Sequence, residues 1–327
     1  MREAARTLHD AGTDVSELTS FISKTNDLLS SRIIDLGMRP DLPAGIECCW
    51  IVMGSEGRYE QTLHTDQDNA IIFSDTAERS PEEVRALLAE PARRVNEAMS
   101  LCGIPLCRGG IMAGNAQWCL SLAEWKEQFA RWIDRGGPQA LLNATVFFDF
   151  RALHGATRLA HELRAWLSER AKGHSRFLLQ LTQNALGNRP PLGFFGGFVV
   201  ATHGGVPRVL DLKVNAITPF VDAARIYSLA TGVGETNTVN RLREASGPAR
   251  ISPAQLDAWT AAFLSMQRLR IRLHMQALSA SEEPRNIVDP RSLPDSDRRA
   301  LKAALREARR LQERLARAYA SVGGIGV

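Results

Sequence analysis

Two aspartates, Asp66 and Asp68, stand one residue apart directly before a short apolar run at residues 69–73. On a strand, side chains two residues apart point to the same face, so both carboxylates can reach one metal ion. Carboxylate oxygens suit Mg²⁺ or Mn²⁺. The spacing therefore predicts a divalent-cation site at this point. The alternative interpretation is a solvated pair of loop carboxylates.

A turn of small residues, Gly54 and Ser55, ends the preceding apolar run at residues 46–53. Bare backbone N–H groups at a helix start can bind phosphate, and the Ser55 hydroxyl can add a donor or instead cap the helix. Arg58 follows in the first helical turn, where it can contact phosphate or form an ion pair with a neighbouring glutamate. A phosphate cradle beside a metal site suits nucleotidyl transfer, because two Mg²⁺ ions can hold the nucleophile and the leaving pyrophosphate.

The segment at residues 54–68 reads GSEGRYEQTLHTDQD and resembles the signature of the DNA polymerase β-type nucleotidyltransferase superfamily. Its fuller pattern looks like that of the nitrogen-regulatory uridylyltransferases and glutamine-synthetase adenylyltransferases. The residues of this segment are more similar still to those of an uncharacterised bacterial group of nucleotidyltransferases, often fused to CBS and cyclic-nucleotide-binding domains. That likeness covers about residues 15–320, and its further segments are 107–118, 147–155, 211–225 and 237–242.

The resemblance implies Mg²⁺ or Mn²⁺ as cofactor, an NTP as substrate, and in-line attack at its α-phosphorus. It also implies a regulatory protein as the acceptor and a role in signal transduction, because the related enzymes modify proteins. Polymerase β-type enzymes usually take a third acid from a later strand, yet the strand expected at 104–113 contains no Asp or Glu. Asp149 is the best alternative for this catalytic role. The competing interpretation of Asp149 is an internal ion pair with Arg151 or another cation.

Composition is ordinary for a globular protein, with 44% hydrophobic and 23% charged residues in 327. The net charge of +4 is too mild to indicate nucleic-acid binding. The N-terminus leads into no apolar signal region, and no apolar run approaches the length of a membrane span. The five cysteines are odd in number and lack metal-ligand spacing. These features predict a cytoplasmic protein with reduced thiols.

The chain reads as an α+β protein with a small mixed β-sheet followed by a mainly helical C-terminal domain. Helical spacing and capping residues predict helices at 14–36, 81–102, 121–134, 138–147, 156–171, 174–187, 218–231, 235–244, 253–280 and 296–320. Two β-prone runs at 198–202 and 206–213 predict a hairpin around Gly204 and Gly205. Lys213 leaves this hairpin on the same strand face as Asp211. It can meet a phosphate or an acidic acceptor, or join a structural salt bridge.

The predicted division is an N-terminal helical segment at 1–40, a nucleotidyltransferase-like domain at 41–150, and a substrate-binding domain at 151–327. The function favoured is Mg²⁺-dependent transfer of a nucleoside monophosphate from an NTP to an acceptor. A first alternative is a nucleotide-binding signalling module that lacks turnover, which the missing third acid supports. A second alternative is an RNA-directed nucleotidyltransferase, supported only by the basic residues of the last helix.

Overall fold

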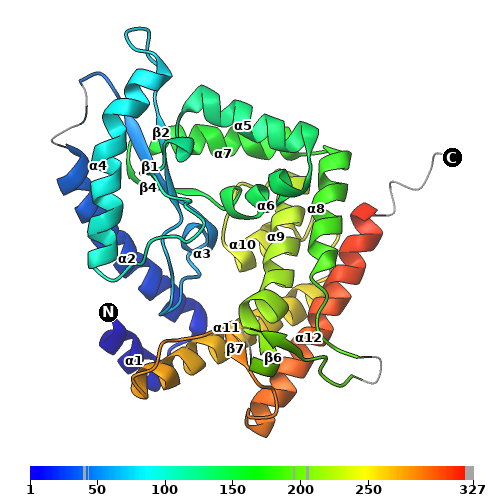
Figure 1. Cartoon of the computed structure of the whole chain (residues 1–327). Coiled ribbons are helices and arrows are strands. Elements are labelled where there is room, and N and C mark those ends of the chain that lie inside the picture. The colour runs from blue at the N-terminus through cyan, green and yellow to red at the C-terminus, as the bar shows by residue number, and fades with distance from the viewer. Residues whose placement is uncertain (40–41, 43, 194–195, 204–205, 321–327) are drawn as a thin grey trace. The chain divides into compact units, whose positions relative to one another are not determined.

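The computed structural model describes residues 1–39, 42, 44–193, 196–203 and 206–320. The chain divides into two compact units (Figure 1). Unit 1 contains residues 1–11 and 17–170, and unit 2 contains residues 12–16 and 171–327. Unit 1 carries a four-stranded mixed sheet, and unit 2 is mainly helical. The predicted α+β class is therefore confirmed.

The sheet of unit 1 has the strand order β3-β2-β1-β4. Its strands are β1 (Cys48–Val52), β2 (Asn69–Phe73), β3 (Cys119–Ser121) and β4 (Arg151–Gly155). β1 pairs antiparallel with both β2 and β4, and β2 pairs parallel with β3. Every residue of β2 is buried, as expected for an apolar strand covered on both faces. Because β1 and β2 are antiparallel neighbours in the centre of the sheet, the end of β1 and the start of β2 lie side by side at one end of the strands. This end of the strands, with residues 53–58 and 66–68, is called the motif edge of the sheet below.

Two long helices cover one face of this sheet, α2 (Val15–Met38) and α4 (Pro81–Leu101) (Figure 1). Their apolar side chains form one core with Trp50 and Val52 of β1 and with Ile71 and Phe73 of β2. The start of α4 follows from its sequence, because Ser80 and Glu83 form a reciprocal capping box. The helices predicted at 14–36 and 81–102 are therefore confirmed.

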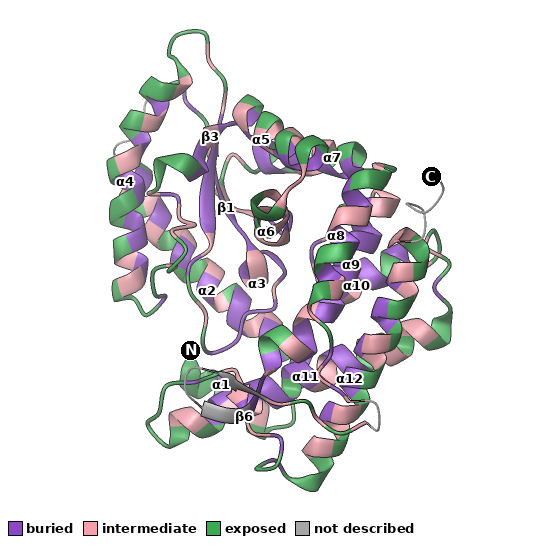
Figure 2. Ribbon diagram, turned by 45° about the vertical axis from the view of Figure 1, so that its right-hand side comes forward, coloured by how far each residue is buried: buried purple, intermediate pink, exposed green. Residues whose placement is uncertain are grey.

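The remaining helices of unit 1 are α1 (Arg2–Asp10), the single turn α3 (Gly54–Gly57), α5 (Leu122–Arg135), α6 (Pro138–Phe147) and α7 (Thr157–Ala171), with a short 3-10 turn η2 (Ala116–Trp118). α5 is fixed to the sheet by Trp125, whose Nε1 donates to the Ile71 carbonyl at 2.9 Å. Aromatic residues of η2, α5 and α6 pack against one another around this contact. The buried strands between these helices are purple in Figure 2.

The strand predicted at 104–113 is wrong. The segment is irregular because it turns at Gly110, which has φ of +67° and whose N–H donates to the Cys107 carbonyl. Its backbone is instead held by single hydrogen bonds, from Gln67 N to Pro105 O and from Asn69 N to Ile111 O. The third strand of the sheet begins only at Cys119.

Unit 2 is built from α8 (Ser175–Gly187), α9 (Thr218–Thr231), α10 (Thr238–Ala245), α11 (Pro253–Ser279) and α12 (Asp295–Leu315), with π-helical turns at Lys213–Ile217 and Ala316–Ala320. α9 is its centre, because the residues from Pro219 to Leu229 are all buried (Figure 2). One face of the basic helix α12 is buried, and it carries Leu301, Leu305, Leu311 and Leu315. These helices match the predicted ones closely.

The predicted hairpin is confirmed as β5 (Ala201–His203) antiparallel to β6 (Val206–Asp211), while its turn at Gly204 and Gly205 lies outside the described residues. A short third strand, β7 (Ile287–Val288), adds to β6. Within the described part of the chain, no helix combines the length and apolar character needed to cross a membrane.

Candidate functional site

The two halves of the Gly54–Asp68 motif meet at the edge of the sheet. The Met53 N–H donates to the Asp68 carbonyl at 2.9 Å, which joins the end of β1 to the residue before β2. Gly54 has φ of +57°, and a Cβ placed on it would lie 2.9 Å from Asp68 Oδ2. Only glycine combines this backbone conformation with so close an approach. The carboxylate predicted to hold metal therefore lies directly against the turn predicted to hold phosphate.

The turn after β1 is the single helical turn α3. Met53 is its N-cap residue and contributes no capping side chain, so Ser55 lies inside the turn and is not the cap. Gly54 and Ser55 are both half-buried, so a ligand can reach them. The first N–H groups of a helix lack intrahelical acceptors. This arrangement can present backbone donors and the Ser55 hydroxyl to an anion.

Asp66 and Asp68 keep the alternation predicted for a strand although β2 begins at Asn69. Asp66 is exposed, Asp68 is half-buried, and Gln67 between them is only 1% exposed. The Gln67 amide donates to the carbonyls of Asn96 and Ile104, at 2.9 Å each. Because Gln67 is anchored inside, its two neighbours are the more exposed residues of the segment, as the alternation predicts.

A buried amide network supports this segment, and sequence reasoning missed it. Asn96 on α4 donates to Gln67 Oε1 at 2.8 Å and to Asn69 Oδ1 at 3.0 Å. Asn69 Oδ1 also accepts from the Ala113 N–H, and Asn96 Oδ1 accepts from the Gly114 N–H. The signal was present in the sequence, because Gln67 and Asn69 are uncharged amides that alternate with the aspartates at the start of an apolar strand. Satisfied amides of this kind fix the backbone that carries the acids.

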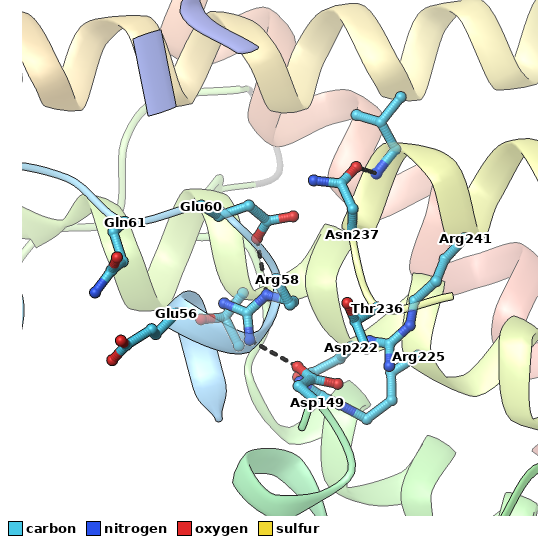
Figure 3. A network of polar contacts seen from close by, with 12 residues as sticks. Glu56, Arg58, Glu60, Gln61, Asp149, Asp222, Arg225, Thr236, Asn237 and Arg241 are labelled. Carbon is cyan, nitrogen blue, oxygen red and sulfur yellow. Dashed lines mark hydrogen bonds and ion pairs between the residues drawn. The ribbon is translucent and has the colours of Figure 1, made fainter. Parts of the chain in front are cut away.

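Arg58 is buried and holds two carboxylates (Figure 3). Its Nε donates to Glu60 Oε2 at 2.8 Å, and its Nη1 donates to Asp149 Oδ2 at 2.6 Å. Of the two interpretations left open for Arg58, the structure contains the ion pair with a neighbouring glutamate. Asp149 is fully buried and forms an internal ion pair with Arg58.

Among the described residues, no group of three or more His, Cys, Asp or Glu side chains is arranged to hold a metal ion. Asp149 instead lies against the end of the α3 turn at Gly57, whereas Asp68 lies against its start at Gly54. A Cβ placed on Gly57 would lie 1.7 Å from the Asp149 carbonyl oxygen, so α3 is pressed against this backbone. The pair Asp66 and Asp68 therefore remains the candidate metal site, without Asp149 beside it.

Glu56 is a further acid of the motif, and sequence reasoning did not single it out for the site. It is 5% exposed, and burial raises its pKa to about 8. The Arg151 guanidinium opposes this rise, while the charges of Asp27, Asp68 and Asp66 add to it. Figure 3 shows its side chain turned away from the Arg58–Asp149 pair. The motif edge thus concentrates negative charge around one buried carboxyl group.

Arg151 links three elements behind this edge. Its Nη2 donates to Asp27 Oδ1 of α2 at 2.7 Å, and its Nε donates to the Glu56 carbonyl at 3.1 Å. Its guanidinium lies over the Tyr59 ring, 3.8 Å from the centroid. Burial is the main cause that raises the pKa of Asp27, although the ion pair with Arg151 opposes it. Arg151 thereby holds the motif turn between α2 and β4.

Lys213 belongs to unit 2 and is exposed. Its predicted position on a strand is wrong, because β6 ends at Asp211 and Lys213 begins a π-helical turn. The Asp211 carboxylate accepts a hydrogen bond from the Val214 N–H of this turn at 2.9 Å. A contact between Lys213 and a phosphate stays a prediction.

Two family models match the chain. Residues 1–139 match the family described as "Putative nucleotidyltransferase DUF294", and residues 175–319 match its "Putative nucleotidyltransferase substrate binding domain". No curated protein matches the chain. Together the two matches cover most of the sequence and agree with the Gly54–Asp68 motif at the edge of a small mixed sheet. Over these two ranges the chain matches the two domains of a nucleotidyltransferase family.

Proposed function

We propose that this protein is a Mg²⁺-dependent nucleotidyltransferase that moves a nucleoside monophosphate from an NTP to an acceptor. The close approach of Gly54 to the Asp68 carboxylate, which would lie 2.9 Å from a Cβ at position 54, carries this proposal. It joins a candidate phosphate cradle to a candidate metal ligand within one edge of the sheet. The resemblance to protein-modifying enzymes favours a regulatory protein as the acceptor.

The residues at this edge fit a hydrated divalent cation. Asp66 is exposed and Asp68 half-buried, so both can offer oxygens while water or phosphate oxygens complete the coordination. When bound, Mg²⁺ or Mn²⁺ would neutralise the phosphate charge and orient the triphosphate. Gly54 would allow the phosphates to approach the backbone, and the Ser55 hydroxyl would donate to a phosphate oxygen. Arg58 would act indirectly, because its contacts with Glu60 and Asp149 stabilise the turn from within.

A nucleotide-binding signalling module without turnover is the second candidate. The observation that favours it is the pairing of Asp149 with Arg58, because that acid was the best available substitute for the missing third carboxylate. Such a module would bind Mg²⁺–NTP at the same residues. It would not release pyrophosphate.

Pyrophosphate release separates the two candidates. The protein would be incubated with each NTP and Mg²⁺, with and without a cell extract as the source of acceptor, and a nucleotide labelled on its α-phosphate would mark any product. The transferase predicts labelled product and pyrophosphate with wild type but not with Asp66→Asn/Asp68→Asn. Saturable NTP binding without either product would support the signalling module instead. Absence of NTP binding would contradict both candidates.

A further inference from the structure

Unit 1 contains a cavity of about 140 Å³ away from the motif edge. Its walls include Ile34 and Met38 of α2, Cys48 and Trp50 of β1, Ile71 of β2 and His154 of β4, and the charged residues Asp35 and Arg39 also line it. Cys48 begins β1, whereas Gly54 follows the other end of that strand. The cavity is therefore separate from the proposed nucleotide site, although the same two central strands form part of its wall.

Trp50 brings an unused hydrogen-bond donor to this cavity wall. Its side chain is buried, with 2% of the residue exposed, and among the described residues Nε1 has no hydrogen-bond partner. The comparable Nε1 of Trp125 donates to a backbone carbonyl, as buried indoles usually do. A buried N–H group without an acceptor is unfavourable, because it has given up water without a replacement. A ligand that accepts a hydrogen bond from Trp50 Nε1 would therefore satisfy a donor that has no acceptor among the described residues.

His154 places a second polar group beside Trp50. The two residues are direct partners in the antiparallel pairing of β1 and β4, so their side chains lie on the same face. The register shifts immediately after this pair, at a bulge, and such irregularities are frequent beside binding sites. No hydrogen bond of the His154 ring occurs among the described residues. Burial raises the pKa of the Cys48 thiol to about 11, so this wall group is uncharged at neutral pH.

Size and chemistry together define the ligand. A cavity of about 150 Å³ lined by apolar side chains can bind benzene. We propose that this cavity binds a small, uncharged aromatic heterocycle of one ring, whose ring nitrogen or carbonyl oxygen accepts a hydrogen bond from Trp50 Nε1. The apolar side chains of Ile34, Met38 and Ile71 would cover the ring. This inference does not depend on the nucleotidyltransferase activity.

Pyridine and benzene form a matched pair of probes, since they have the same size and differ in the acceptor. Each would be titrated into the whole ¹⁵N-labelled protein at pH 7.5, and the indole N–H resonances would be followed by NMR. Trp50→Phe assigns the Trp50 resonance. We expect saturable pyridine binding that moves this resonance downfield, with benzene binding roughly five- to tenfold more weakly. Trp166→Phe, outside the cavity, should leave this preference unchanged.

Two variants decide the outcome even if one of them folds poorly. Trp50→Phe should bind the two probes with equal affinity, and Cys48→Leu should weaken both because it fills the cavity. Equal affinities in wild type would overturn the hydrogen-bonding role of Trp50. No saturable shift with either probe would mean that water alone fills the cavity, and would overturn the proposal.

Discussion

The buried Glu56 gives the sharpest prediction about stability. Its pKa in the folded protein is about 8, whereas the ordinary value is 4.5, so the folded protein retains a proton that the unfolded chain releases. Because the carboxyl pKa is raised, the contribution of Glu56 to the free energy of unfolding is fully present below pH 4.5 and is lost as the pH rises towards 8. Within that window the loss is about 1.4 kcal/mol per pH unit. The whole shift corresponds to at most about 5 kcal/mol, and relaxation of the site leaves an effect of roughly 2–5 kcal/mol.

Glu56→Gln removes this titration while preserving the shape of the protonated side chain. The variant should therefore gain stability over wild type as the pH rises from 5 to 9, and the gain should level off above about pH 8. Urea unfolding would be followed by tryptophan fluorescence in buffer with a chelator, because five of the six tryptophans lie in unit 1. Glu78→Gln, which removes an exposed carboxylate of the same unit, controls for the loss of one charge. A difference between Glu56→Gln and wild type that does not change with pH would refute the reasoning.

Three further substitutions test the motif turn. Gly57→Ala should prevent folding of unit 1 or lower the free energy of unfolding by more than about 3 kcal/mol, measured by thermal unfolding. The reason is that the new Cβ would lie 1.7 Å from the Asp149 carbonyl oxygen. Gly187→Ala is the control and should be tolerated, because nothing lies within 4 Å of the Cβ it adds. Arg58→Met should lower the free energy of unfolding by about 3–5 kcal/mol, since it removes the guanidinium that pairs with the buried carboxylates of Glu60 and Asp149. A loss below about 1 kcal/mol would show that these ion pairs contribute little. Gly54→Ala should weaken Mg²⁺–NTP binding about tenfold or more in calorimetry, because the φ of +57° and the adjacent Asp68 carboxylate both oppose a Cβ at this position. The circular dichroism spectrum should stay that of the wild-type fold. Unchanged affinity would mean that the phosphates bind elsewhere.

Local sequence signals predicted the elements that depend on local interactions. The helix at 81–101 could be found because Ser80 and Glu83 cap it and Pro81 starts it. The outward pair Asp66 and Asp68 could be found because alternation along an extended segment needs only the sequence spacing. These features are decided within a few residues of one another.

The parts that were missed depend on distant residues. Arg58 and Asp149 are 91 positions apart, so no periodicity indicates their ion pair. The charges that act on the pKa of Glu56 include Asp27 of α2 and Arg151 of β4, which only the folded chain brings near it. The segment at 104–113 has an apolar character that suits a strand, yet the turn at Gly110 and its single bonds to the Gln67 and Asn69 backbone replace a regular ladder.

Calorimetric titration of Mg²⁺–NTP tests the central claim most directly. The claim predicts saturable binding to wild type that requires the divalent cation and is lost in Asp66→Asn/Asp68→Asn. Asp75→Asn, an aspartate after β2 that accepts from the Ala123 N–H, serves as the matched control and should bind like wild type. Equal cation-dependent binding by wild type and the double variant, with both proteins folded, would contradict the assignment of the metal and nucleotide site to this edge of the sheet.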